Sequence, residues 1–294
     1  MQIKLLSIII PIYKKEKTIL KELIKLYSTL KTTPYKFEII GVVDGTNLDN
    51  SLVEARKLKK PEVKIYGYKN NKGKGQAVRY GMQIAKGDVV TFIDSGGDVK
   101  PQSLVMLLEH MKWYNADIII GSKLHSASIV KNYSGFRRVL TYGYYLIVKL
   151  LFHLKVRDTQ TGLKAYKKYV LENVLDKLVI KQFVFDIEVL AVAYKLGYKR
   201  IYDAPVFVDF GKSTSTMFGL SLGKTIALFL IDTIGVWYRM NILRYYDKGR
   251  KKVKIFDTDI NMWVNTGEMT DKHQIVINFV NSVFSRLGRI LHFK

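Results

Sequence analysis

Short acidic segments follow two of the apolar runs in the first hundred residues. Asp44 comes directly after the run 38–43, and the segment Asp-Ser-Gly-Gly-Asp at 94–98 follows the run 88–93. Each run has the length and composition of a buried strand. Carboxylates just beyond the carboxyl ends of parallel strands lie where open α/β sheets bind ligands. They could accept hydrogen bonds from a nucleoside or hold a divalent cation.

A basic, glycine-bearing loop lies between these two acidic segments. Its sequence is Asn-Lys-Gly-Lys-Gly at 71–75, and a helical pattern follows it. Glycines let a backbone approach a ligand closely, and the start of a helix favours negative charge. Lys72 and Gly73 are therefore candidates for contact with phosphate, and the loop and carboxylates together predict a nucleotide site. The alternative is a plain helix entry with solvated lysines, because the spacing matches neither a Walker A loop nor Gly-x-Gly-x-x-Gly.

Alternating strand and helix patterns place these segments in the chain. Strands are expected at 5–10, 38–43, 62–67, 88–93 and 117–121, with helices at 16–30, 51–60, 76–85 and 101–113. This alternation predicts an α/β fold with a mostly parallel sheet covered by helices on both faces. Further helices are expected at 131–154, 183–196, 216–246 and 271–292, and a further strand at 199–208.

Composition narrows the classes of partner. The 294 residues carry a formal net charge of +23, and none is a cysteine, which excludes disulfides and thiol chemistry. Such a charge predicts an anionic partner, although a lysine-rich soluble surface would also explain it. No nucleic-acid-binding motif accompanies it, so we expect no nucleic-acid partner. The start of the chain is interpreted as a first core strand and not as a signal peptide.

Taken together, the motifs resemble family 2 glycosyltransferases with the GT-A fold, in particular dolichol-phosphate mannose or glucose synthases and their bacterial polyprenyl-phosphate relatives. The resemblance extends from residue 8 to about residue 215. It is carried by Ile-Ile-Ile-Pro-Ile-Tyr at 8–13, the loops 44–51 and 71–77, the acidic segment 94–98, Asp-Thr-Gln-Thr-Gly-Leu-Lys at 158–164 and Phe-Val-Phe-Asp-Ile-Glu at 183–188. A Gln-x-x-Arg-Trp segment is absent from the sequence, which argues against a processive polysaccharide synthase.

The resemblance implies a nucleotide-sugar site and a metal site. The residues that it assigns to the sugar donor are Pro11, Tyr13, Asp44, Lys72, Gly73, Asp94, Ser95 and Glu188. Asp94 and Asp98 are expected to share Mn²⁺ or Mg²⁺, because such cations prefer oxygen ligands. Gly96 stands where the family has its second metal aspartate. The alternative is weakened metal binding, with lysines partly substituting, or lost activity.

The resemblance also implies a site for an acceptor phosphate. The residues assigned to it are Lys123, Arg137, Thr141 and Lys212. Arginine suits phosphate because its guanidinium donates two parallel hydrogen bonds. Asp94, Arg137 and Asp158 are expected to be catalytic, with Asp158 positioning the reactants first and removing a proton second. The plainer alternatives are a loop-capping aspartate at Asp158 and a basic helix face against anionic lipid at Arg137.

Two apolar helical patterns suggest contact with a membrane surface. No segment reaches the roughly 18–20 uncharged apolar residues of a spanning helix. The patterns at 139–151 and 225–246, with the basic run 248–254, are instead expected to lie on anionic lipid. Trp237, Tyr238, Tyr245 and Tyr246 would supply interfacial side chains. Alternatively, one or both helices pack on the sheet or at a dimer interface.

These expectations combine into one leading hypothesis. The chain would be an inverting enzyme that moves mannose or glucose from a GDP- or UDP-linked sugar to a polyprenyl or dolichyl phosphate. Residues 1–215 would form the catalytic GT-A domain, and residues 216–294 an amphipathic, basic region that holds the protein peripherally on the cytoplasmic face of a membrane. The alternatives are a soluble sugar or lipid-linked glycan as acceptor, or a catalytically impaired nucleotide-sugar-binding membrane scaffold.

Overall fold

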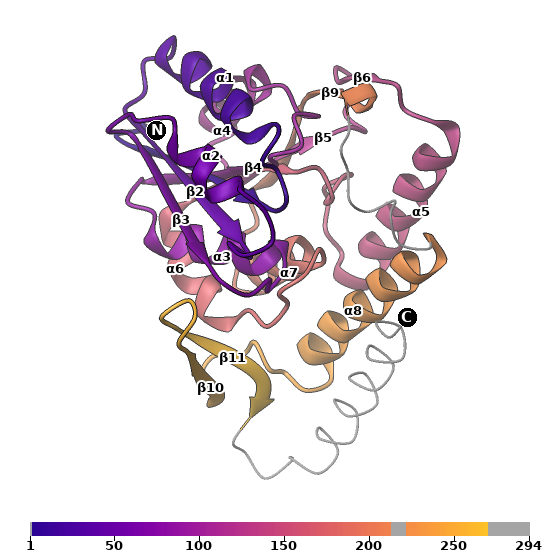
Figure 1. Cartoon of the computed structure of the whole chain (residues 1–294). Coiled ribbons are helices and arrows are strands. Elements are labelled where there is room, and N and C mark those ends of the chain that lie inside the picture. Colours follow the sequence, from indigo (N-terminus) through magenta and orange to yellow (C-terminus); the bar gives the residue numbers. More distant parts are fainter. Residues whose placement is uncertain (1, 213–221, 270–294) are drawn as a thin grey trace.

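A central sheet determines where the ligands of this protein can bind. The computed structural model describes residues 2–212 and 222–269 (Figure 1). Within these ranges seven strands form one sheet in the order β3-β2-β1-β4-β7-β5-β8. They are β1 (Leu6–Ile12), β2 (Phe37–Asp44), β3 (Val63–Tyr68), β4 (Val89–Ile93), β5 (Ile118–Ser122), β7 (Leu163–Lys167) and β8 (Ile201–Pro205).

The sheet is parallel except at β7. This strand pairs antiparallel with β4 on one side and with β5 on the other. The remaining pairs, β3-β2, β2-β1, β1-β4 and β5-β8, are parallel. The carboxyl ends of all the parallel strands therefore lie at the same edge of the sheet as the amino end of β7.

Helices cover both faces of the sheet, as the alternation predicts. They are α1 (Ile19–Lys31), α2 (Ser51–Arg56), α3 (Lys74–Ile84), α4 (Gln102–Trp113), α6 (Lys168–Val174), the short 3₁₀ helix η1 (Leu175–Lys177) and α7 (Phe185–Lys195). Successive side chains of a strand point to opposite faces. In β1, Ile8 and Ile10 pack with α1 and α4, whereas Ile9 packs with α3 and α7. The buried strands thus divide the interior into two cores.

A second group of elements lies beside β5 and β8. It comprises β6 (Ile129–Lys131), α5 (Gly135–Phe152), β9 (Phe207–Asp209), the 3₁₀ turn η2 (Phe210–Lys212) and α8 (Leu222–Asn241). Ser134 caps α5, because its Oγ accepts a hydrogen bond from the Arg137 amide. The two long helices lie side by side, joined by a 2.7 Å hydrogen bond between the hydroxyls of Tyr144 and Thr233 (Figure 1).

The described part of the C-terminal region differs from its prediction. The basic run 248–254 leads into a hairpin of β10 (Lys252–Asp257) and β11 (Met262–Met269). Tyr245 and Tyr246, predicted to lie at a lipid interface, are fully buried in the core that also contains α3 and α7. That prediction is wrong for these two tyrosines, because their rings fill space beneath the sheet. The helix expected at 271–292 lies outside the described residues.

The two helices expected on the membrane are formed, at 135–152 and 222–241. Neither these nor the other helices within the described ranges are apolar over a length that would cross a bilayer.

Candidate active site

The ligand-binding edge of the sheet collects the predicted residues from distant parts of the sequence. Asp44 ends β2, and Tyr13, Asp94 and Lys123 each follow the last residue of β1, β4 or β5. Because these strands share one direction, their ends meet at one edge. The turn before β7 enters the same edge from the opposite direction, since the Asp94 amide donates to the Gly162 carbonyl at 2.9 Å. The topology therefore brings the candidate residues together.

Asp44 fixes the basic loop that precedes α3. Its two carboxylate oxygens accept the backbone amides of Lys72 at 2.7 Å and Gly73 at 2.9 Å. Burial raises the pKa of the Asp44 carboxyl even though these amides favour its charged form. Gly73 has a φ of +101°, and a Cβ there would lie 2.6 Å from the Lys181 carbonyl oxygen. Asp44 and Gly73 thus determine the shape of this loop.

Asp94 pairs with a lysine that the sequence analysis left unassigned. The ammonium of Lys74 lies 2.8 Å from one Asp94 carboxylate oxygen and 2.9 Å from the other. Although burial opposes the charged form, the carboxylates of Asp94 and Asp186 raise the pKa of Lys74. A Cβ at Gly162 would come within 1.9 Å of Asp94 Oδ2, so this approach requires glycine. The Lys74 pairing joins the loop to the acidic segment.

A chain of buried charges extends from this pair toward the end of β5. Asp186, at the start of α7, is buried and lies 3.2 Å from the ammonium of Lys164. Lys164 has no exposed surface, and it donates to the Thr161 carbonyl at 2.8 Å. The Thr161 hydroxyl in turn donates to Asp158 at 2.6 Å. The motif 158–164 signals Lys164, but only the fold places it against Asp186.

Asp158 and Lys123 form the far end of this chain. The Asp158 carboxylate lies 2.8 Å from the Lys123 ammonium and accepts the Lys123 amide at 2.9 Å. Burial alone would raise the pKa of Asp158, but the lysine and the Thr161 hydroxyl outweigh it and lower that pKa to about 2. General bases work best with a pKa near the working pH. Asp158 is therefore suited to positioning and electrostatics rather than to proton removal.

The residues predicted for the acceptor phosphate lie in two places. Lys123 is at the sheet edge, whereas Arg137 and Thr141 are on the first turns of α5. The Arg137 guanidinium lies over the ring of Phe210 in η2, 5.0 Å from its centre. The neighbouring Asp209 amide donates to the Asp98 carbonyl at 2.9 Å, which brings η2 against the acidic segment. Thr141 accepts a hydrogen bond from Tyr133 at 2.7 Å.

Lys212 ends η2 and follows Phe210 by two residues, and its side chain lies outside what the structure describes. Its backbone lies in the same 3₁₀ turn as Phe210, which Arg137 contacts.

Three of the residues predicted to bind the sugar donor, Pro11, Ser95 and Glu188, instead make contacts that hold the backbone of the site in place. The buried Ser95 hydroxyl donates to the Pro11 carbonyl at 2.7 Å, which ties the ends of β4 and β1 together. Glu188 has no exposed surface and accepts the amides of Val179 and Ile180 and the hydroxyl of Tyr246. We therefore assign Glu188 to holding this segment in place, and not to contact with a sugar.

The acidic segment suits a divalent cation that a ligand helps to bind. Within the described ranges, no three acidic or histidine side chains gather closely enough to hold a metal alone. Asp94 and Asp98 supply two carboxylates from one loop. A Cβ at Gly96 would lie 3.7 Å from Asp98 Oδ2, so position 96 lies in van der Waals contact with the Asp98 carboxylate. Magnesium is commonly bound by one or two carboxylates together with substrate phosphates, and these residues fit that arrangement.

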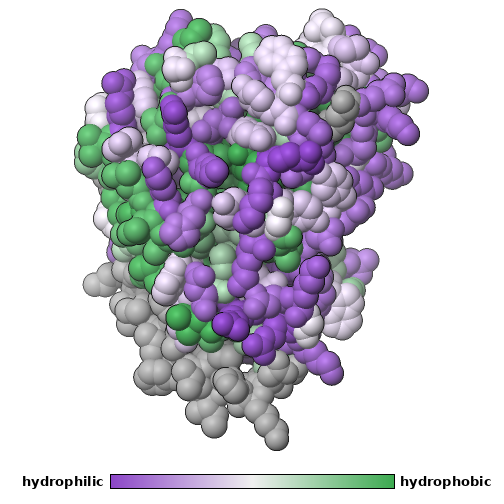
Figure 2. Space-filling view, turned by 180° about the vertical axis from the view of Figure 1, so that it is seen from behind, coloured by the Kyte–Doolittle hydropathy of each residue, from purple (hydrophilic) through white to green (hydrophobic). Residues whose placement is uncertain are grey.

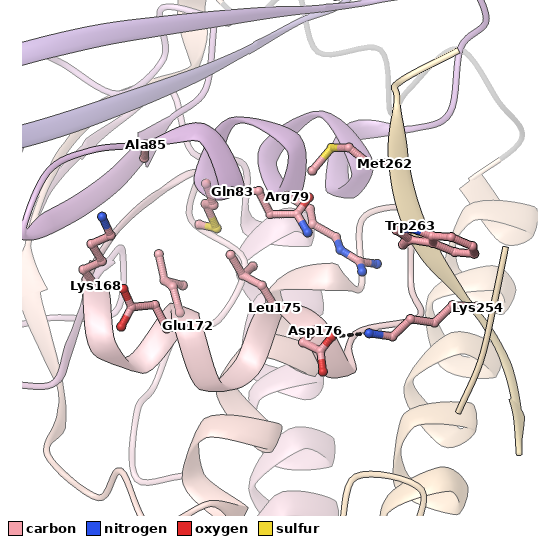
Figure 3. Close-up of a pocket in the computed structure, with 12 residues that line it drawn as sticks. Arg79, Gln83, Ala85, Lys168, Glu172, Leu175, Asp176, Lys254, Met262 and Trp263 are labelled. Atoms are coloured by element: carbon pink, nitrogen blue, oxygen red, sulfur yellow. Dashed lines mark hydrogen bonds and ion pairs between the residues drawn. The ribbon is translucent and has the colours of Figure 1, made fainter. Parts of the chain in front are cut away.

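A separate cavity of about 480 Å³ lies between α3, α6, η1 and the hairpin. In Figure 3, Trp263 of the hairpin faces Arg79, and Lys254 of the hairpin is paired with Asp176. Among the described residues, its lining includes none of those predicted for the active site. The ligand-binding edge, and not this cavity, carries the candidate chemistry.

Comparison with known proteins finds relatives over most of the chain. The chain is 27% identical to a Drosophila melanogaster dolichyl-phosphate beta-glucosyltransferase over 249 residues, 79% of this chain and 76% of that one. It is 28% identical to the human protein of the same name over 251 residues, 80% of this chain and 78% of the relative.

The fold also has a counterpart among solved structures. Glucosyl-3-phosphoglycerate synthase from Mycobacterium tuberculosis, crystallised with Mn²⁺, UDP-glucose and phosphoglyceric acid, matches with a TM-score of 0.56 and 17% identity. The match covers 86% of this chain and 84% of that structure, and it supports the GT-A fold. Residues 7–175, which include the ends of β1, β2, β4 and β5, match the glycosyl transferase family 2. The chain is therefore a glycosyltransferase and belongs to family 2.

Proposed function

We propose that this glycosyltransferase moves glucose from UDP-glucose to a polyprenyl or dolichyl-type phosphate, with inversion at the anomeric carbon. The named relatives favour glucose over mannose and a dolichyl phosphate over a soluble acceptor. A protein of the same fold was crystallised with UDP-glucose, which favours uridine over guanosine.

One observation carries this proposal. A series of contacts runs from Asp44 through the basic loop to Lys74 and Asp94, and the Asp94 amide donates to the Gly162 carbonyl. Thr161, the neighbour of Gly162, then donates to Asp158, which pairs with Lys123. The two ends of this series hold the residues predicted for the sugar donor and for the acceptor phosphate. A sugar bound between these ends would lie between the donor diphosphate and the acceptor phosphate, in position for transfer.

The reaction needs little proton transfer. An oxygen of the acceptor phosphate attacks the anomeric carbon from the face opposite the diphosphate. The bond between that carbon and the diphosphate oxygen breaks, and the electron pair leaves with the nucleoside diphosphate. Because a phosphate monoester is already largely ionised at neutral pH, the attacking oxygen needs no strong base. Asp158 can therefore remain a carboxylate that orients Lys123.

A divalent cation fits the donor end of this series. Asp94 and Asp98 would hold it with diphosphate oxygens, where it would stabilise the negative charge of the leaving group. Lys74, which follows the basic loop, already forms an ion pair with Asp94. Asp94 must therefore share its oxygens between this lysine and the cation.

We also propose that α5 brings the site to a membrane. Apolar side chains at spacings of three or four residues form an exposed stripe along one face of this helix: Phe136, Val139, Tyr142, Leu146 and Leu150. Exposed Arg138 and Lys149 flank it. Hydrophobic side chains gather at the left edge of Figure 2, the side on which α5 lies when Figure 1 is turned round. Such a face suits an anionic lipid surface. That the protein binds the cytoplasmic face of a membrane stays a prediction.

Product analysis tests the function directly. The purified protein is incubated with UDP-glucose or GDP-mannose, a short polyprenyl phosphate and Mn²⁺, and the lipid product is identified by mass spectrometry. We expect glucosyl polyprenyl phosphate from UDP-glucose, and much less product from Asp94→Asn. A soluble glucoside, or glucosyl lipid made equally well by Asp94→Asn, would contradict the proposal.

A further inference from the structure

The turn of the β10–β11 hairpin contacts the loop that the sugar donor is proposed to use. The hairpin lies beyond residues 7–175, where the family match ends. Asp259, in its turn, accepts the backbone amides of Lys69 at 2.9 Å and Asn70 at 3.0 Å, and the Asn70 side-chain amide at 3.1 Å. Asp257, at the end of β10, lies 2.7 Å from the ammonium of Lys72.

The hairpin is itself fixed to the body of the protein. The side-chain amide of Asn265 donates to the carbonyls of Asp176 at 2.7 Å and Leu178 at 3.1 Å. Val264 and Met269 are buried in the core that contains α3 and α7. Lys254 pairs with Asp176 at the outer side of the hairpin (Figure 3). The two carboxylates of the turn are therefore presented from a rigid support.

The basic loop is consequently held from two directions. From the sheet, Asp44 binds the amides of residues 72 and 73, and from the hairpin, Asp259 binds the amides of residues 69 and 70. Both carboxylates fix backbone groups, so they set the path of the loop whatever side chains it carries. Lys72 was predicted to meet phosphate, but its ammonium is directed to the hairpin turn.

We propose that Asp259 is a positioning residue for the nucleotide sugar, and that the hairpin turn is a second clamp on its binding loop. This inference rests on the proposed sugar-donor site. It adds the β10–β11 hairpin, which lies outside the family match, to that site, and it assigns Lys72 to the contact with the hairpin turn. A loop held at only one side would sample other conformations, and nucleotide binding would then have to select the productive one.

Three variants test the clamp. Asp259→Ala removes the acceptor of both loop amides. Asp259→Asn keeps one oxygen acceptor, so it should retain part of the nucleotide binding that Asp259→Ala loses. Lys254→Met removes an ion pair of the same hairpin at its outer side, so it serves as the matched control.

UDP affinity is measured by calorimetry with Mn²⁺, and the kinetic constants are measured with UDP-glucose. We expect Asp259→Ala to weaken UDP binding and raise the KM for UDP-glucose about tenfold, since hydrogen bonds to a charged group are lost, with kcat changed less than twofold. Asp259→Asn should fall between Asp259→Ala and the unaltered protein, and Lys254→Met should match the unaltered protein. Unchanged UDP affinity in a folded Asp259→Ala protein would overturn the inference.

Hydrogen exchange separates this inference from the proposed function. Peptides that contain residues 69–73 should exchange faster in Asp259→Ala and Asp259→Asn than in Lys254→Met, with or without nucleotide. If the unaltered protein fails to bind UDP, the proposed donor is wrong, while the exchange result still decides whether the clamp exists. Equal exchange in all the variants would refute the clamp, even where UDP binds.

Discussion

Replacing Asp158 by asparagine should separate its structural and catalytic roles. The carboxylate is buried and accepts hydrogen bonds from Lys123, Thr161 and the Gln160 amide. Asparagine keeps the shape and one oxygen acceptor but removes the charge. Lys123, whose side chain is only 9% exposed, then loses its counter-ion. We expect a less stable protein in which the end of β5 no longer holds the Lys123 ammonium in place.

The pKa of Asp158 sets the size of the effect. It falls from 3.8 to about 2 on folding, a change of roughly two units, and each unit corresponds to about 1.4 kcal/mol. The ionised group therefore contributes on the order of 2 kcal/mol. Because the folded pKa is the lower one, this contribution is present above pH 4 and is lost as the pH falls through 2. The deficit of Asp158→Asn should accordingly be largest at neutral pH.

Urea unfolding at pH 7 and pH 3 measures this deficit. We expect Asp158→Asn to lower the free energy of unfolding by about 2 kcal/mol at pH 7, and more where the buried Lys123 charge stays unpaired. The double variant with Lys123→Met should recover part of that loss. A variant as stable as the unaltered protein at pH 7, or an equal deficit at both pH values, would refute this account of the buried pair.

Turnover of the same variants tests the catalytic role. If Asp158 acts by holding Lys123, each single variant should lose activity, and the double variant should lose little more than either. Multiplying losses would instead mean that Asp158 and Lys123 act independently on the reactants.

Four further changes have specific expected outcomes. Arg137→Lys should raise the KM for polyprenyl phosphate about tenfold in steady-state assays, because the bidentate fork is lost, and an unchanged KM would exclude phosphate contact. Gly96→Asp should tighten Mn²⁺ binding in the presence of UDP severalfold by electron paramagnetic resonance, and equal affinity would argue against a cation at Asp98. Leu146→Glu should reduce co-sedimentation with anionic vesicles while Lys149→Gln reduces it less, and full retention by both would remove α5 from the membrane contact. Glu188→Gln should lower stability by about 2 kcal/mol in thermal unfolding, since a buried acceptor of three donors is weakened, and an unchanged melting temperature would contradict that role.

The sequence is sufficient to predict the sheet edge and most of what lies there. Apolar runs with an acidic residue at the end, separated by helical patterns, have few arrangements other than parallel strands with shared carboxyl ends. Asp44 and Asp94 therefore could be placed at one edge from local patterns alone. The family resemblance adds Lys123 and Asp158, which no local periodicity would identify.

Other contacts depend on pairings between distant segments that local patterns do not encode. The insertion of β7 between β4 and β5 brings Lys164 to Asp186, although β7 follows α5 in the chain. A basic run at 248–254 gives no sign that the next residues form a hairpin whose aspartates face Lys72. Tyr245 and Tyr246 have the composition of an interfacial belt, yet packing under the sheet buries them. In each case a tertiary contact overrides the local signal.

The charge balance at the sheet edge bears on how it can accept two phosphate-bearing ligands. Lysines 72, 74, 123 and 164 lie there, and each already pairs with a carboxylate, of Asp257, Asp94, Asp158 and Asp186 respectively. Although the chain carries +23 in all, these four pairs add no net charge to the site. A lysine can attract phosphate only to the extent that it leaves its own aspartate. The paired lysines therefore fix geometry, and a cation held by Asp94 and Asp98 would supply positive charge for a leaving diphosphate.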